Sequence, residues 1–225
     1  MRNEVPFNPL DLTNLGLSII QALVERPIEA LPPSETFTGA GIYAIYYSGN
    51  FGPYRAIAEE NIPGSYKVPI YIGKAIPAGA RRTGFGIASS TGTVLYDRLA
   101  EHAASIRLAE NLNIEDFRCR YLVVEQLWIP VAEALLIQRY RPLWNIIVDG
   151  FGNHDPGSGR YNQKRSAWDT IHPGRIWATR LQPSKLTEDQ IFERVVAYLT
   201  APPVVQADIS MAAIEEASED AEPPA

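Results

Sequence analysis

Three short runs of β-branched and aromatic residues constrain the fold more than any other feature of the sequence. They are GIYAIYY at 41–47, PIYIG at 69–73 and FRCRYLVVE at 117–125. Each has the length and composition of a strand, and the third alternates at its start before it becomes apolar. The sequence therefore predicts a small sheet of about three strands.

Apolar residues at helical spacing predict four helices around these strands. The expected helices cover residues 10–26, about 94–110, Pro130 to about Tyr140, and the stretch from a capping box of Thr187 and Gln190 to near Thr200. Pro130 is tolerated at a helix start because its missing N–H costs little there, and Pro142 stops the same helix. That helix is apolar nearly all round, so we expect it to be buried.

Segments without periodicity separate these elements. The proline-rich stretch RPIEALPPSETF predicts an extended connector, and residues 48–68, 77–93 and 149–180 predict irregular loops. The last residues are rich in Ala, Pro and Glu, which is typical of disorder. We divide the chain into an N-terminal helix with its connector (1–38), a core (39–149), a loop region with a C-terminal helix (150–200) and an acidic tail (201–225).

The composition of the 225 residues is that of an ordinary globular protein, with 46% apolar and 20% charged residues. The single cysteine, Cys119, excludes an intramolecular disulfide and a cysteine zinc site within one chain. We therefore expect a reducing, cytoplasmic setting. The start MRNEVPFNPL lacks a basic region followed by an apolar run, so no signal peptide is expected. No apolar stretch approaches the roughly 18 residues that a membrane span needs.

The net charge of −6 is concentrated at the C-terminus. Six acids and no Lys or Arg follow Thr200, so the other 20 of the 26 acids balance the 20 bases. Between Arg160 and Arg180, five bases stand against one acid, Asp169. Such a local basic patch is what contact with phosphate groups requires, whereas the overall charge is a poorer guide. The alternative is a solvated polar loop.

Two tripeptides, GIY at 41–43 and YIG at 71–73, lie on the first two predicted strands. Each alone occurs by chance in strand-rich proteins. They are followed, in order, by a helix with Arg98 and His102, a buried helix with Glu133, and Asn145 at the end of PLWN. In this order the sequence resembles the GIY-YIG nucleases over roughly residues 39–149. The resemblance implies an α/β fold of the α+β type, with a small, mostly antiparallel central sheet flanked by helices.

Two later segments, DGFGNHDPGSGR and SAWDTIHPGRIWA, are similar to the C-terminal region of a restriction-endonuclease branch that cuts CCGCGG. With them the resemblance covers most of residues 31–180, and that branch accepts an insertion between GIY and YIG. It implies a Mg²⁺-dependent type II restriction endonuclease that cuts double-stranded DNA at a G·C-rich palindrome. It also implies a homodimer, at least on DNA, and a cognate DNA methyltransferase in the same bacterial or archaeal cell.

Glu133 is the lone carboxylate of the apolar run 129–137. A glutamate in the first turn of a helix is also favoured by the helix dipole, which is the alternative to a functional role. Mg²⁺ needs only one or two carboxylates when waters and phosphate oxygens complete its shell. The resemblance therefore implies that Glu133 is the metal ligand.

Arg98 and His102 are four residues apart and share one helix face, which is also the pattern of a solvated face. The resemblance implies that Arg98 holds the scissile phosphate through charge-assisted hydrogen bonds. It makes Tyr43 the general base, although a phenol of pKa about 10 needs nearby positive charge for that role. Lys74 and His102 remain alternative bases, and Tyr71 would position the phosphate or the water. Without the motif, both tyrosines are ordinary strand aromatics.

Asn145 follows Pro142 at the end of a predicted helix, where a C-terminal cap is the alternative to a role in the site. The resemblance implies that it orders the site through hydrogen bonds. Cys119 is expected in the core rather than as a nucleophile. The basic side chains expected to contact DNA are Arg81, Arg82, Arg160, Lys164 and Arg175.

Other nuclease signatures fit less well. The PD-(D/E)xK pattern needs an acid two positions before a lysine, and none of the lysines has one: Lys67, Lys74, Lys164 and Lys185. An HNH motif drawn from His154, Asn162 and His172 would end before Pro173, a poor context for its helix. Repair and homing nucleases append DNA-binding domains, for which the residues after Arg180 leave little room. A DNA-binding protein without cleavage has no need of the full set of site residues.

Overall fold

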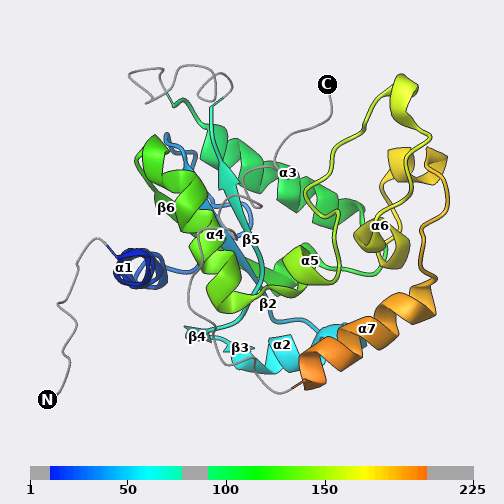
Figure 1. The fold of residues 1–225 in the computed structure, drawn as a ribbon, viewed down its shortest axis with the longest axis horizontal. Coiled ribbons are helices and arrows are strands. Elements are labelled where there is room, and N and C mark those ends of the chain that lie inside the picture. Colours follow the sequence, from blue (N-terminus) through cyan, green and yellow to red (C-terminus); the bar gives the residue numbers. More distant parts are fainter. Residues whose placement is uncertain (1–10, 78–90, 202–225) are drawn as a thin grey trace, which may run out of the picture.

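The structure is a computed structural model that describes residues 11–77 and 91–201. Figure 1 shows how its elements surround a central sheet. The helices and strands are α1 (Leu12–Val24), β1 (Glu29–Ala30), β2 (Gly41–Tyr47), α2 (Arg55–Glu60), β3 (Asn61–Ile62), β4 (Ser65–Tyr66), β5 (Pro69–Ala75), α3 (Val94–Leu108), β6 (Phe117–Val123), α4 (Ile129–Tyr140), α5 (Leu143–Ile146), α6 (Ala167–Ile171) and α7 (Glu188–Thr200). Short 3-10 helices are η1 (Gly52–Tyr54), η2 (Ile114–Asp116), η3 (Gln126–Trp128), η4 (Ser158–Arg160) and η5 (Ile176–Arg180).

The central sheet has four strands in the order β1-β6-β2-β5, and every neighbouring pair is antiparallel. In the middle strand, Tyr43 faces Tyr121 of β6 on one side and Gly73 of β5 on the other. The predicted α+β fold with a small antiparallel sheet flanked by helices is confirmed. The three predicted strands are present, and the proline-rich connector adds a fourth, the two-residue β1, beside β6.

Helices cover both faces of the sheet because side chains alternate along its strands. The even-numbered residues of β2 pack with Leu23 of α1 and with α4. The odd-numbered residues from Tyr43 onward point the opposite way, into a larger cluster that includes α3, α5, α6 and α7. In Figure 1, α1 and α4 accordingly lie on one side of the sheet and α3 on the other. All seven residues of β2 are buried between these layers.

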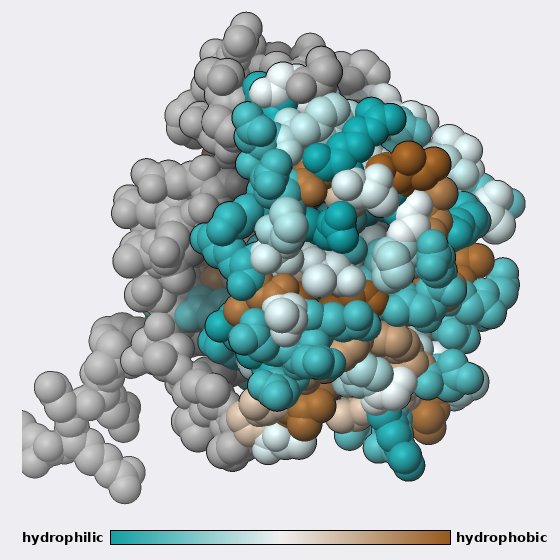
Figure 2. Space-filling model, turned by 90° about the vertical axis from the view of Figure 1, so that its right-hand side faces the viewer, coloured by the Kyte–Doolittle hydropathy of each residue, from teal (hydrophilic) through white to brown (hydrophobic). Residues whose placement is uncertain are grey.

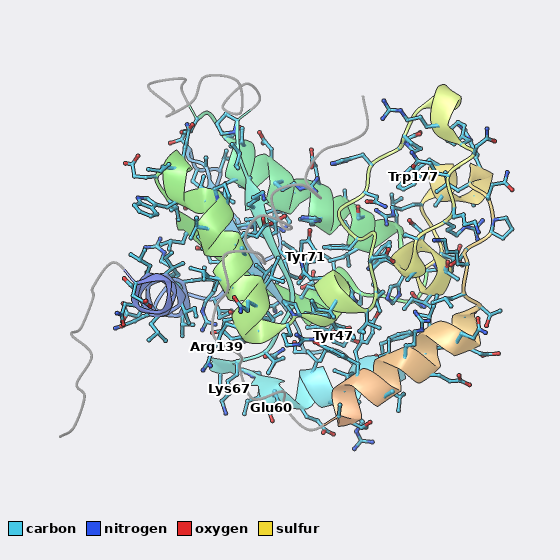
Figure 3. All side chains as sticks on the ribbon, viewed as in Figure 1. Tyr47, Glu60, Lys67, Tyr71, Arg139 and Trp177 are labelled. Atoms are coloured by element: carbon cyan, nitrogen blue, oxygen red, sulfur yellow. The ribbon has the colours of Figure 1, made fainter. Side chains whose placement is uncertain are left out.

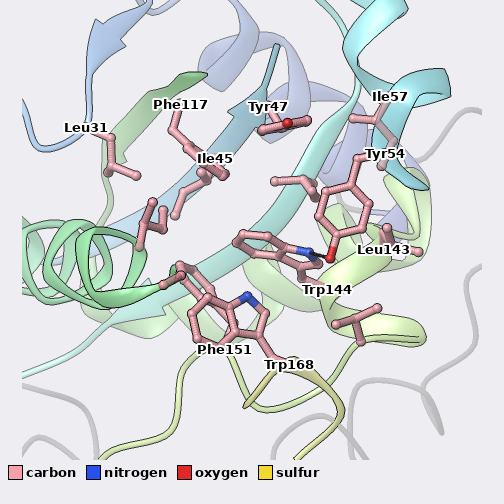
Figure 4. Close-up of a cluster of buried hydrophobic side chains, with 14 of the residues drawn as sticks. Leu31, Ile45, Tyr47, Tyr54, Ile57, Phe117, Leu143, Trp144, Phe151 and Trp168 are labelled. Carbon is pink, nitrogen blue, oxygen red and sulfur yellow. Dashed lines mark hydrogen bonds between the residues drawn. The ribbon is translucent and has the colours of Figure 1, made fainter. Parts of the chain in front are cut away.

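The segment after α5 belongs to the same hydrophobic core as the sheet. Phe151, Trp168 and Val195 are buried in the cluster that also contains Trp144 of α5. The ring centroids of Trp144 and Trp168 are 5.9 Å apart, and the Phe151 ring lies 4.5 Å from that of Trp144 (Figure 4). This packing fixes the C-terminal segment against the layer that carries α3 and α5.

Two segments that were expected to be irregular contain short ordered elements. The insertion at 48–68 folds into η1, α2 and a β3–β4 hairpin, and residues 149–180 contain η4, α6 and η5. The buried amide of Asn61 organises the hairpin, since it donates to the carbonyls of Tyr47 and Val68 and accepts from two backbone N–H groups. Elements this short leave no periodicity in the sequence, so the pattern could not predict them.

The helix ends agree with the sequence signals. The capping box of Thr187 and Gln190 is present at the start of α7. α4 has Pro130 in its first turn and ends where Arg141 adopts a left-handed φ of 44°, directly before Pro142. Arg141 thus closes the helix and Pro142 prevents its continuation. Within residues 11–77 and 91–201, no helix is long and apolar enough to cross a membrane.

Candidate active site

The candidate site lies at β5, which is an edge strand of the sheet. Tyr71 and Lys74 are on opposite faces of β5, because their partners in β2 are Ile45 and Ile42, which pack into different clusters. Tyr71 lies near the middle of the molecule (Figure 3). Groups from α3 on one face and from α4 on the other can therefore meet beyond this edge.

Tyr43 and His102 form a buried pair on the α3 side. The Tyr43 hydroxyl is 2.6 Å from Nε2 of His102, and both side chains are 1% exposed. Burial raises the pKa of Tyr43 well above its ordinary value, and burial together with Arg98 lowers the pKa of His102 well below its own. Both groups are therefore neutral near pH 7, and one proton lies between them.

Gly73 makes room for the hydroxyl of Tyr43. A Cβ atom at position 73 would lie 2.4 Å from the Tyr43 hydroxyl oxygen and 2.6 Å from the carbon that bears it. Real Cβ atoms essentially never approach another atom so closely, and the Tyr43 ring is enclosed in the core. The glycine that ends YIG is thus required by the tyrosine that ends GIY, which links the two tripeptides physically.

Tyr71 lies next to this pair, with its ring centroid 6.2 Å from that of Tyr43 and 5.2 Å from that of His102. Loss of solvation raises the pKa of Tyr71; Arg98 opposes the rise and the Glu133 carboxylate adds to it. The two charges come from opposite faces of the sheet, Arg98 from α3 and Glu133 from α4, and both act on the Tyr71 hydroxyl.

Arg98 of α3 is held by three neighbours. Its Nη1 is 2.9 Å from Oε2 of Glu101 and also contacts Nε2 of His154, while Nη2 donates to the carbonyl oxygen of Gly152 at 2.9 Å. The Arg98 side chain is 22% exposed and that of His154 is 64% exposed, so this end of the site opens to solvent. The guanidinium is oriented and remains accessible.

Sequence reasoning did not assign Glu101, Gly152 or His154 to the site. Glu101 is three residues after Arg98 on α3, a spacing at which helical side chains interact. Gly152 and His154 belong to the DGFGNHDPGSGR segment that carries the resemblance to restriction endonucleases. Both signals were present, but only the fold brings this segment to α3.

Lys74 and Glu133 form an ion pair on the α4 side. Nζ of Lys74 is 2.6 Å from Oε2 of Glu133, and each side chain is 14% exposed. Burial raises the pKa of the Glu133 carboxyl, and the charges of Lys74 and Arg98 oppose that rise. The two cations thus favour the ionised carboxylate against the larger effect of burial.

Asn145 of α5 binds the backbone of the edge strand. Its Oδ1 accepts from the N–H of Ile72 and its Nδ2 donates to the carbonyl of the same residue, both at 2.9 Å. An edge strand leaves such groups without a partner strand, and the amide satisfies both of them. Asn145 thereby fixes β5 between Tyr71 and Gly73.

The basic residues expected to contact DNA do not share one environment. Arg160 and Lys164 are exposed on the C-terminal segment, and Figure 2 shows that this side of the molecule is mainly hydrophilic with small apolar patches. Arg81 and Arg82 lie outside the described residues. The expectation for Arg175 is wrong: its side chain is 2% exposed, and Nε lies 2.7 Å from Oδ1 of Asp169 in the interior.

Comparison with known proteins agrees with this geometry. A family model described as the Eco29kI GIY-YIG domain matches residues 35–199, which is well over half of the chain. A comparison with individual curated proteins finds no match. The matched range contains β2, β5, α3 and α4, and with them every described residue of the candidate site. The chain therefore belongs to the GIY-YIG restriction endonuclease family represented by the Eco29kI domain.

Proposed function

We propose that the protein is a type II restriction endonuclease that hydrolyses phosphodiester bonds of double-stranded DNA at a G·C-rich palindrome. One observation carries the proposal: the Tyr43–His102 pair, Arg98 and the Lys74–Glu133 pair surround the edge of β5 in a chain of this family. The set combines a proton acceptor, a cation for the phosphate and a carboxylate for a metal. Phosphodiester hydrolysis requires these three capacities.

Tyr43 and His102 are the proposed proton acceptors. The phenol oxygen takes a proton from the attacking water while its own proton passes to Nε2 of His102, 2.6 Å away. Burial raises the pKa of Tyr43 and Arg98 opposes that rise, so further positive charge at the site favours the phenolate. Lys74 is the weaker candidate, because its Nζ is already engaged by the Glu133 carboxylate 2.6 Å away.

Arg98 is the proposed phosphate ligand. Its guanidinium is paired with the exposed carboxylate of Glu101. A phosphate oxygen can replace that carboxylate with a charge-assisted hydrogen bond of the same kind. Arg98 and Tyr43 both influence the Tyr71 hydroxyl, and the Tyr71 ring lies 5.2 Å from that of His102. We assign to Tyr71 the positioning of the phosphate or the water.

Mg²⁺ is the proposed cofactor, with Glu133 as its protein ligand. The donor chemistry fits, because the carboxylate is a hard oxygen ligand at a partly exposed position. No group of three or more His, Cys, Asp or Glu side chains that could hold a metal occurs within 11–77 and 91–201, so waters and phosphate oxygens would complete the shell. Bound there, Mg²⁺ would supply Lewis-acid stabilisation of the phosphate charge.

The proposed target is a palindrome resembling CCGCGG, cut by a homodimer on DNA. The segments DGFGNHDPGSGR and SAWDTIHPGRIWA support this specificity by their resemblance to the branch that cuts that sequence. One chain holds one set of site residues, which cuts one strand, so two antiparallel strands call for two copies related by a dyad. Arg160 and Lys164 are the described candidates for DNA contact. A cognate methyltransferase would protect the DNA of the host.

Digestion of a long DNA of known sequence tests the proposal, when the ends produced with Mg²⁺ are mapped. The expected result is double-strand breaks at one palindrome of G·C pairs. Breaks without a common palindrome, or nicks in one strand only, would reject the restriction-enzyme assignment in favour of a repair or homing type of nuclease. Specific binding without any cleavage would indicate a DNA-binding protein that has lost catalysis.

A further inference from the structure

The loop 150–154 forms one wall of the candidate site. The Phe151 ring stacks on His102 at 4.5 Å with an interplanar angle of 17°. The carbonyl of Gly152 accepts from Arg98, and His154 contacts the other terminal nitrogen of the same guanidinium. The loop thus touches both the proposed phosphate ligand and the proposed proton acceptor.

The backbone of this loop packs directly against the site. A Cβ atom at position 152 would lie 3.0 Å from the Tyr71 hydroxyl and 3.1 Å from Nη2 of Arg98. Position 152 therefore has little room for a side chain beside Tyr71 and Arg98. The direct contact is the 2.9 Å hydrogen bond from Nη2 of Arg98 to the Gly152 carbonyl, through which a displacement of the loop reaches Arg98.

Arg175 holds the loop from the interior. Its Nη1 donates to the carbonyl oxygens of Phe151 at 3.1 Å and Asn153 at 3.0 Å, and its Nη2 donates to the carbonyl of Gly150 at 3.0 Å. One buried guanidinium therefore binds three carbonyls within four consecutive residues.

The guanidinium is itself fixed on every side. Its Nε lies 2.7 Å from Asp169, whose side chain is equally buried, and the ring centroids of Trp168 and Trp177 lie 4.2 and 5.0 Å from its Cζ. A planar group held by an ion pair and two aromatic rings has one orientation, which lysine cannot reproduce. The segment that carries Arg175 can therefore set the position of the loop.

We propose that Arg175 is a positioning residue for DNA cleavage, acting through the loop 150–154 on Arg98 and the Tyr43–His102 pair. The inference rests on the proposed nuclease function and adds to it a residue that lies outside the site. It explains why the SAWDTIHPGRIWA segment accompanies the catalytic residues, since Arg175 of that segment connects to α3 through backbone carbonyls.

Arg175→Lys tests the proposal, because it keeps the buried positive charge that Asp169 needs and removes the fork that binds the loop. We expect the single-turnover cleavage rate to fall by about 10- to 100-fold, the effect of a misplacement of about 1 Å. DNA binding in Ca²⁺ should stay within about threefold, because the Arg175 side chain is buried and does not reach the surface. Equal losses in binding and rate would overturn the assignment.

Arg120→Lys is the matched control. Arg120 also donates to two backbone carbonyls and lies over an aromatic ring, with Cζ 5.2 Å from the Tyr46 centroid, but it contacts neither the loop nor the site. Its lysine variant should cleave DNA like the wild type. A similar loss in both variants would show that the effect is general destabilisation.

A double-mutant cycle shows whether Arg175 acts through Arg98. In an Arg98→Lys background, which lacks the second nitrogen that binds the Gly152 carbonyl, Arg175→Lys should cost much less in rate than in the wild type. Additive losses would contradict the proposed route. If the Arg175 variant does not fold, Asp169→Asn, which weakens the same orientation at unchanged volume, is carried through the same cycle.

Hydrogen exchange separates this inference from the proposed function. Amides of the loop 150–154 should exchange faster in Arg175→Lys than in the wild type, while those of α7 stay unchanged. This result is expected even if the wild-type protein cuts no DNA, in which case the nuclease proposal alone fails. Unchanged exchange in the loop would overturn the positioning role, whatever the protein cleaves.

Discussion

The hydroxyl of Tyr43 lies 2.6 Å from Nε2 of His102, and this pair is enclosed between β2 and α3. Burial shifts the two pKa values in opposite directions, up for the phenol and down for the imidazole. Both shifts favour the neutral pair, so transfer of the proton to His102 depends on charge that arrives with the substrate and the metal.

Tyr43→Phe should reduce the single-turnover cleavage rate by about 10²- to 10⁴-fold, the usual contribution of a positioned proton acceptor. The change removes only the hydroxyl and leaves the ring in the core. It also leaves Nε2 of His102 buried without its partner, which should lower the free energy of unfolding by about 1–3 kcal/mol. Quenched-flow cleavage and urea denaturation measure the two effects.

Tyr46→Phe is the control for that variant. Tyr46 lies on the same strand and is buried as well, but it points to the opposite face, toward Arg120. Its phenylalanine variant should cleave at the wild-type rate. If Tyr43→Phe also cleaves at the wild-type rate while remaining folded, Tyr43 is not the proton acceptor, and Lys74 becomes the next candidate.

Glu133→Gln should abolish Mg²⁺-dependent cleavage while specific DNA binding survives. The substitution removes the charge without removing volume, so Mg²⁺ loses its protein ligand and Lys74 loses its partner. A gel-shift assay in Ca²⁺ measures binding, and plasmid linearisation in Mg²⁺ measures cleavage. Glu125→Gln, at an exposed position before η3, should keep both activities. Cleavage by Glu133→Gln at close to the wild-type rate would eliminate the metal assignment.

The sequence predicted the sheet and the grouping of site residues because those features depend on residue patterns within short segments. The three strands, the helices at 94–108 and 129–140 and the capping box of α7 follow from spacing and end signals. Arg98 and His102 share a helix face by spacing alone. The structure brings them next to Tyr43 and Tyr71, as the resemblance implied, and their roles in catalysis stay predictions.

The buried position of Arg175 could not be predicted in the same way, because burial of a charged residue depends on distant partners. In the sequence it belongs to a basic segment, and a basic segment indicates contact with phosphate groups. The fold instead supplies Asp169, two tryptophans and three loop carbonyls, which together satisfy the guanidinium in the interior. Likewise, no local pattern indicates that the loop 150–154 returns to α3.

The pH dependence of stability should show the buried imidazole of His172. It contacts the Tyr54 hydroxyl and the Asn111 side chain, and burial lowers its pKa from 6.5 to about 3. Because the folded pKa is below the unfolded one, this stability is complete above about pH 6.5 and is lost as the pH falls toward 3. At pH 5, one and a half pH units below 6.5 at 1.36 kcal/mol each, the loss is about 2 kcal/mol.

Urea denaturation at pH 7 and pH 5 measures this loss, with His172→Gln as the comparison. Glutamine does not ionise, so the variant should lose less free energy of unfolding between the two pH values than the wild type. Some dependence should remain, because burial also lowers the pKa of His102. An identical pH dependence in the variant and the wild type would contradict the assignment to His172.

Gly73→Ala should inactivate the enzyme by displacing Tyr43. The new Cβ would lie 2.4 Å from the Tyr43 hydroxyl oxygen, and the enclosed ring can yield only by leaving its contact with His102. Overpacking of this kind costs about 1–3 kcal/mol of folding free energy, which urea denaturation measures. Gly52→Ala, where no atom lies within 4 Å of the new Cβ, is the control and should leave stability and cleavage unchanged. The double variant Gly73→Ala/Tyr43→Phe separates the two contacts: without the hydroxyl the new Cβ still lies 2.6 Å from Cζ of the ring, so the variant should recover only part of the lost stability and no cleavage. Full cleavage by Gly73→Ala would mean that Tyr43 need not stay in contact with His102.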